Sequence, residues 1–151
     1  IDFGPVDLPG PTGEANTLLL VPRGRALCLG PDRETAFAQA VQALAAGNAV
    51  LAVAPGARAA LAPLLGKGLP VEALDGTVDP ADLGGIGVEV VACSADAATL
   101  RAIRRALSFR DGPIVRLVAA VINPTAYTHE RAVCVDTTAA GGNASLLAAA
   151  E

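Results

Sequence analysis

The sequence predicts an α/β fold with a mainly parallel sheet. Short, unbroken apolar runs alternate with Ala-rich helical stretches, the order typical of β-α-β units with right-handed crossovers. Hydrophobic residues make up 52% of the 151 residues but aromatic residues only 3%, so Ala, Leu and Val must build a closely packed core. We expect a Rossmann-like three-layer sandwich with an N-terminal β-hairpin and an extended C-terminal tail. The predicted segments are a lead-in (1–16), the Rossmann-like domain (17–121) and a flap with the tail (122–151).

The first part of the chain predicts extended structure. Residues 1–16 are rich in Pro and Gly, which favour an extended lead-in because proline fixes φ and removes a backbone donor. The apolar runs Thr17–Val21 and Ala26–Leu29 flank the turn-like segment 22–24. Together they predict a β-hairpin or two edge strands.

A helix is predicted to follow Gly30. Asp32 is a plausible N-cap. Phe37, Val41 and Leu44 recur at the i, i+4, i+7 spacing of one buried helix face. Gly47 then predicts a left-handed C-cap that ends the helix.

The middle of the chain predicts further strands and helices. After the strand expected at Ile86–Cys93, Ser94 or Asp96 is expected to cap a helix. The apolar residues of this helix face inward and its arginines lie on a solvated face. The expected strands are Ala49–Val53, Val71–Leu74, Ile86–Cys93, Ile114–Val118 and Arg131–Val135. One helix is expected at Ala57–Leu65, and residues 75–85 are expected to be a loop with one helical turn. In the helix after Ile86–Cys93, the inward residues are Leu100, Ile103 and Leu107, and the outward ones are Arg101, Arg104 and Arg105.

Charge and composition exclude several kinds of partner. The formal net charge is −4, and no basic run is longer than the Arg104–Arg105 pair, which argues against a nucleic-acid surface. No apolar stretch approaches the roughly 20 residues of a membrane-spanning helix. The three cysteines, Cys28, Cys93 and Cys134, are widely spaced and odd in number, which favours a reducing compartment. We expect a piece of a longer cytoplasmic protein.

The residues supply no complete active site. The turns at 54–56 and 93–96 contain neither of the Gly-rich phosphate-binding patterns, and Asp96 would repel a pyrophosphate. His129-Glu130 does not continue into a zinc motif, because Val occupies position 133. Cys93 is the best-placed thiol, but a buried structural role is favoured. We expect no catalytic, cofactor-binding or metal-binding residue, with a regulatory nucleotide-binding module as the alternative.

The C-terminal tail, 133–147, is the most unusual segment. Its small polar side chains cannot bury enough area to order the segment alone. Gly141-Gly142 could form an anion-binding nest, but a turn that lets the backbone approach another surface is favoured. We expect the tail to contact a neighbouring module through Asp136, Thr137, Thr138, Gly141, Gly142, Asn143, Ser145 and Leu146.

Three segments of the sequence resemble two known families. LAAGNAVLAVAP at 44–55 is similar to the start of the NAD-binding sheet in the aldehyde dehydrogenase superfamily, although the lysine for the adenosine ribose is replaced by Val53 or Ala54, and Cys93-Ser94-Ala95 stands where that superfamily has a Gly-Ser-Thr loop. LPGPTGE at 8–14 and VDTTAAGGNASLL at 135–147 resemble the C-terminal region of the proline utilization A family.

The resemblance to proline utilization A implies a role within a larger enzyme. That family joins an FAD-dependent proline dehydrogenase to an NAD-dependent glutamate semialdehyde dehydrogenase, with a tunnel that channels the intermediate. By resemblance, this chain is a structural domain without a catalytic function or cofactor. The resemblance implies that it packs on the catalytic aldehyde dehydrogenase module of the same polypeptide and that its tail helps close the substrate site and tunnel. The resemblance leaves open a homo-oligomer and a parent that lies peripherally on the inner membrane.

Overall fold

The structure is a computed structural model that describes residues 4–137. These residues form two compact units. One contains residues 22–129, and the other contains residues 4–21 and 130–137. Strand β2 (Glu14–Pro22) begins inside the expected lead-in, and strand β8 (Thr128–Asp136) lies inside the expected flap with the tail.

A five-stranded parallel sheet forms the centre of the larger unit. Its strand order is β5-β4-β3-β6-β7, and every neighbouring pair is parallel. This confirms the predicted α/β class with a mainly parallel sheet. The strands are β3 (Arg25–Cys28), β4 (Ala49–Val53), β5 (Val71–Leu74), β6 (Val90–Ala92) and β7 (Arg116–Val118).

The central strand of this sheet is β3, which corrects the placement of the predicted hairpin. The segment Ala26–Leu29 does not pair with Thr17–Val21. Instead, Ala26 lies between Val50 of β4 and Val90 of β6. The N-terminal hairpin is formed by β1 (Val6–Leu8) and β2, in antiparallel register. A short apolar run beside a turn looks the same in a hairpin and in a buried parallel strand, so local sequence could not separate the two.

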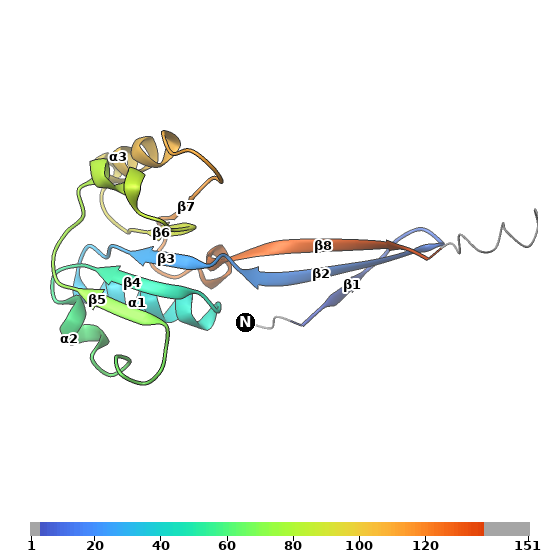
Figure 1. Cartoon of the computed structure of the whole chain (residues 1–151), viewed down its shortest axis with the longest axis horizontal. Coiled ribbons are helices and arrows are strands. Elements are labelled where there is room, and N and C mark those ends of the chain that lie inside the picture. Colours follow the sequence, from blue (N-terminus) through green and yellow to red (C-terminus); the bar gives the residue numbers. More distant parts are fainter. Residues whose placement is uncertain (1–3, 138–151) are drawn as a thin grey trace, which may run out of the picture. The chain divides into compact units, whose positions relative to one another are not determined.

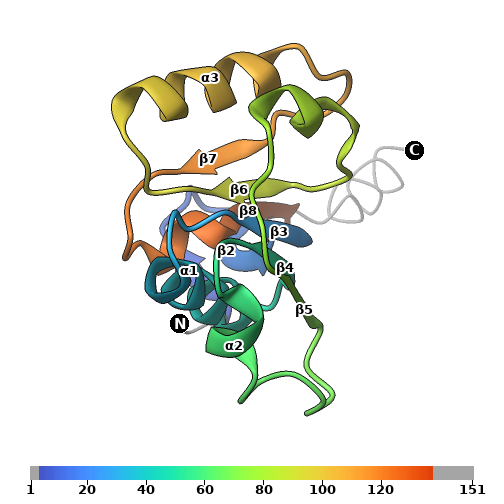
Figure 2. The same cartoon turned by 90° about the vertical axis from the view of Figure 1, so that its left-hand side faces the viewer.

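Helices cover both faces of the sheet (Figure 2). The helices α1 (Arg33–Ala45) and α2 (Ala57–Leu61) lie on one face, and α3 (Ala97–Ser108) lies on the other with the 3₁₀ helix η1 (Pro80–Gly85). The helix predicted to reach Leu65 ends at Leu61. Pro63 contributes to this, because proline lacks the N–H that would continue the helical hydrogen bonds.

The buried face of α1 differs from the prediction. Phe37 and Val41 are 37% and 39% exposed, and Leu44 is only half-buried. The face that packs on the sheet consists of smaller residues and one glutamine: Ala36, Gln39, Ala40 and Ala43. Alanines let the helix approach the sheet closely, so the size of an apolar side chain was a poor guide to its direction.

The opposite face carries the main apolar cluster, where the prediction for α3 is confirmed. Ile103 and Leu107 are buried against Leu27 and Val91, and Leu100 packs beside them. Asp96, rather than Ser94, caps the helix. Strands β6 and β7 are shorter than the predicted runs 86–93 and 114–118.

The smaller unit is a three-stranded sheet in the order β1-β2-β8 (Figure 1). Val6 pairs with Leu18, and the N–H of Thr137 donates to the carbonyl oxygen of Gly13 at 2.7 Å. The strand expected at 131–135 is therefore longer than predicted. All residues of β1, and all of β8 except Thr128, are exposed.

Candidate functional site

The topology of the parallel sheet marks one position for a ligand. The chain moves outward from β3 to β4 and β5, then crosses back to β6 and β7 on the other side. In such sheets, ligands bind outside the carboxyl ends of the two strands where the order reverses. The loops there are 29–32 after β3 and 93–96 after β6. Sequence reasoning named the second loop but missed the first, because β3 was assigned to the hairpin.

The side chain of Gln39 bridges these two loops. It is fully buried. Its Oε1 accepts from the N–H of Gly30 at 3.0 Å, and its Nε2 donates to the Gly30 carbonyl oxygen at 3.3 Å and to Ser94 Oγ at 3.2 Å. The N–H of Ser94 donates to the same carbonyl oxygen at 2.8 Å. The backbone N–H and carbonyl oxygen of Gly30 and the hydroxyl of Ser94, which could bind a ligand at this position, are therefore already bonded to Gln39.

Gly30 is required by this arrangement. Its φ is +73°, and an added Cβ would lie 2.7 Å from the backbone nitrogen of Asp32. The sequence contained a sign of this loop, because Gly30 stands between an apolar run and a helix N-cap. A phosphate-binding turn has a glycine at the same position.

The N-termini of α1 and α3 are occupied by carboxylates of the chain itself. Asp32 accepts from the N–H of Thr35 at 2.8 Å, and Asp96 accepts from the N–H groups of Ala98 and Thr99 at 2.8 and 2.9 Å. Hydrogen bonds from the backbone N–H of Thr35 and Thr99, respectively, are the largest cause of the lowered pKa of each aspartate. Both stay charged at neutral pH, so each opposes a phosphate at these helix ends.

The titratable groups near this crevice do not form a nucleophile with a base. Cys93 is buried, and desolvation raises its pKa. Burial raises the pKa of Cys28 to about 12. A thiol with a raised pKa is a poor nucleophile at neutral pH. His129 is exposed, and among residues 4–137 no three His, Cys, Asp or Glu side chains gather as a metal site requires.

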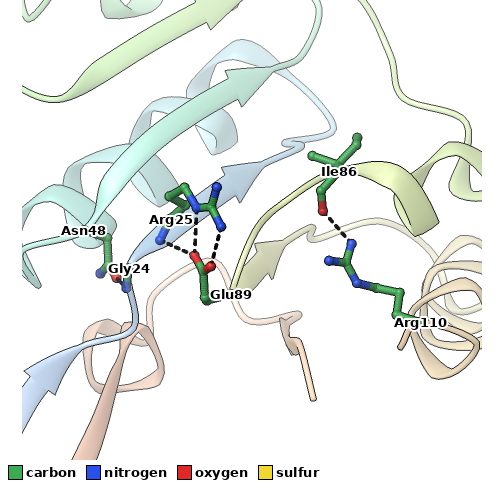
Figure 3. Close-up of polar contacts among 6 residues, drawn as sticks. All are labelled: Gly24, Arg25, Asn48, Ile86, Glu89 and Arg110. Carbon is green, nitrogen blue, oxygen red and sulfur yellow. Dashed lines mark hydrogen bonds and ion pairs between the residues drawn. The ribbon is translucent and has the colours of Figure 1, made fainter. Parts of the chain in front are cut away.

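The turn 46–48, which carries the aldehyde-dehydrogenase-like motif, has a structural role. Gly47 has a left-handed φ of +80°, as predicted for the end of α1. The buried side chain of Asn48 accepts from the N–H of Gly24 at 2.9 Å (Figure 3). It also donates to the carbonyl oxygens of Ala43 and Tyr127, both at 3.0 Å. One amide thus joins the start of β3, the end of α1 and the segment before β8.

The amino end of the sheet holds polar contacts of the same structural kind. Arg25 and Glu89 form an ion pair at 2.7 Å, and the backbone N–H of Arg25 donates to the same carboxylate at 2.6 Å (Figure 3). Beside them, a mostly apolar groove of about 430 Å³ runs along the first residues of β3, β4 and β5. The guanidinium of Arg110 donates to the carbonyl oxygens of Leu83 and Ile86.

Of the residues predicted for tail contacts, only Asp136 and Thr137 lie in the described part of the chain. Asp136 is the last residue of β8, and Thr137 follows it; both are exposed. Thr138, Gly141, Gly142, Asn143, Ser145 and Leu146 lie outside the described residues.

Comparison with known proteins identifies relatives of nearly the whole chain. It is 38% identical over 149 residues to the Bifunctional protein PutA of Escherichia coli K12, and 35% identical over 155 residues to that of Rhizobium meliloti. These alignments cover 93% and 95% of this chain but only 11% and 12% of the relatives. No protein-family model matches the chain.

Solved structures agree with these relatives. Proline utilization A (PutA) of Bradyrhizobium japonicum, mutant D779W, matches with a TM-score of 0.58 and 31% identity, over 76% of this chain and 13% of that one. An NAD-dependent benzaldehyde dehydrogenase from Corynebacterium glutamicum matches with a TM-score of 0.60 over 77% of this chain and 28% of that one, at 14% identity, and so shares the fold alone.

The parallel sheet with helices on both faces is a fold that the chain shares with an aldehyde dehydrogenase. The chain belongs to the PutA family, in which it corresponds to about one tenth of the polypeptide. In the described part of the chain, no helix is both long and apolar enough to cross a membrane.

Proposed function

We propose that this chain is a non-catalytic, structural C-terminal domain of a bifunctional cytoplasmic enzyme. The parent would oxidise proline to pyrroline-5-carboxylate with FAD and then oxidise the derived semialdehyde to glutamate with NAD. The domain packs on the aldehyde dehydrogenase module of the same polypeptide. Its tail, from Asp136 onward, helps seal that module's substrate site and the tunnel between the two active sites.

The observation that carries this proposal is the state of the crevice at the carboxyl ends of β3 and β6. Gln39 uses the hydrogen-bonding groups of both loops, and Asp32 and Asp96 cap the two helices that a bound phosphate would need. A dinucleotide fold whose crevice is filled by its own side chains keeps the shape of its relatives and can serve as a packing partner.

The sealing role follows from the chemistry of a reactive intermediate. A closed passage keeps the intermediate from escaping and excludes water from the site. A segment of Gly, Ala, Ser and Asn can lie close to another surface, because few side chains obstruct its backbone.

Removing residues 138–151 from the parent enzyme tests this role and leaves β8 whole. We expect proline oxidation alone to stay at the wild-type rate, because its site is elsewhere. The coupled conversion of proline to glutamate should slow at least several-fold and show a lag as the intermediate leaks into solution. The measurement is NADH formation from proline, with trapping of the free intermediate. Coupled turnover equal to wild type, without a lag, would show that the tail does not seal the tunnel.

A further inference from the structure

A second groove lies along the outer edge of the parallel sheet, between α3 and β7. Its volume is about 530 Å³. Leu107 and Val115 contribute nearly buried apolar surface, whereas Ile114 is 95% exposed. The apolar floor and Ile114 beside it offer a partner apolar surface to cover.

The backbone of β7 is available on one side. Among residues 4–137, β7 is an outermost strand that pairs with β6 alone. The N–H of Arg116 donates to Glu89, and the carbonyl oxygen of Val118 accepts from Cys93. In a parallel strand, alternate residues bond to opposite sides, so the N–H and C=O groups of Leu117 point away from the sheet.

The groove is strongly basic in a chain that is acidic overall. The formal net charge of the whole chain is −4. Arg104, Arg110 and Arg116 line the groove, with no acidic residue among its lining. Within residues 4–137, Arg104 and Arg116 have no carboxylate at ion-pair distance; the ion pairs there are Arg25–Glu89 and Arg33–Glu34.

The positive charge is uncompensated on both faces of the edge. Leu117 packs toward the cluster under α3, and side chains alternate along a strand, so Arg116 lies on the face opposite Arg104. Burial and then the charge of Arg116 lower the pKa of Arg23, which places a second cation near that face.

We propose that this groove binds an extended acidic segment of the parent polypeptide, which adds to β7 as a sixth strand. Its backbone would bond to Leu117, its carboxylates would meet Arg104 on one face and Arg116 on the other, and an apolar side chain would cover Ile114. The proposal rests on the proposed function in one respect, namely that the chain acts as one domain of a longer polypeptide.

Two observations select this occupant. Arginines at an exposed edge repel a basic strand and attract an acidic one. The chain corresponds to only 11% of its relatives' length, so most of the polypeptide is available, and a tethered segment binds at high effective concentration.

Hydrogen exchange in the full-length parent enzyme tests the added strand. The Leu117 amide should be protected in the wild type and should exchange at least tenfold faster in the variant Arg104→Glu/Arg116→Glu. The matched control is Arg101→Glu/Arg105→Glu, which makes the same charge change on α3 outside the groove lining. Amides of β3 and β4 report whether the fold is kept; if they also exchange faster, Arg104→Gln/Arg116→Gln replaces the reversal. Rapid exchange of Leu117 in the wild type, or equal effects of both double variants, would overturn the proposal.

Crosslinking identifies the occupant. In Arg104→Lys, a carbodiimide joins the lysine amine directly to a carboxylate held against it, and mass spectrometry locates the link. We expect an Asp or Glu in the same polypeptide, outside the residues described here. A link to a second copy, detected by mixing isotope-labelled protein, or no link at all, contradicts the proposal. Neither readout depends on coupled turnover, so this proposal and the sealing role fail separately.

Discussion

Within the larger unit, the buried polar side chains of Gln39 and Asn48 join separate segments, and that of Thr128 bonds within its own turn. Each bonds to backbone groups: Gln39 to Gly30, Asn48 to three segments, and Thr128 to the Thr125 carbonyl oxygen at 2.9 Å. Buried backbone groups need partners, and these side chains supply them where no strand or helix does. Sequence patterns could not identify them, because hydrophobic periodicity assigns Gln and Asn to the surface.

Replacing the amide at position 48 should destabilise the domain. Asn48→Ala leaves the N–H of Gly24 and the carbonyl oxygen of Tyr127 without this partner, whereas the Ala43 carbonyl oxygen keeps the backbone N–H of residue 48. We expect the free energy of unfolding to fall by about 3 kcal/mol. Asn16→Ala is the control, because its side chain bonds only to exposed Glu14, and should change it by less than about 0.5 kcal/mol. Urea unfolding of the chain followed by circular dichroism measures both. Equal midpoints would show that Asn48 does not join the three segments.

At the scale of elements, the two long helices differ in how well their sequences predict them. The predicted inward face of α3 is confirmed, because its Leu and Ile side chains pack in the apolar cluster. On α1, the larger residues are partly exposed and alanines pack on the sheet. N-caps Asp32 and Asp96 follow from sequence, because a cap depends on residues within one turn.

Truncating one apolar residue on each helix tests which helix face packs on the sheet. Ile103→Ala should lower the free energy of unfolding by about 3 kcal/mol, since it removes buried methyl groups and leaves a cavity. Phe37→Ala should cost clearly less, because the ring is 37% exposed. Denaturant midpoints of the two variants measure the difference. A larger loss for Phe37→Ala would mean that α1 packs through the face expected from its sequence.

For the whole molecule, the sequence predicted the class of fold but not the order of its strands. The apolar run of β4 indicated a buried parallel strand, which is confirmed. The central place of β3 depends on pairing with β4 and β6, the second more than 60 residues away, and no local pattern encodes that pairing. As a result, the loop containing Gly30 was missed as half of the crevice.

The filled crevice predicts that dinucleotides do not bind. A ligand present at 100 times its Kd would add about 2.7 kcal/mol to the stability of the folded chain, so even moderate affinity is visible as a rise in Tm. We expect no rise with NAD, NADP or ATP at millimolar concentration. A saturable rise that Gly30→Ala abolishes, in a variant that remains folded, would favour the regulatory nucleotide-binding module instead.

The bridge made by Gln39 also limits how the domain can evolve. A route from these loops to a phosphate site must change Gln39, Asp32 and Asp96. Each change removes hydrogen bonds that now hold the sheet or cap a helix before any ligand can replace them. Every intermediate is therefore less stable and still unable to bind. Selection for packing alone can therefore maintain this arrangement, and selection for binding cannot easily reverse it.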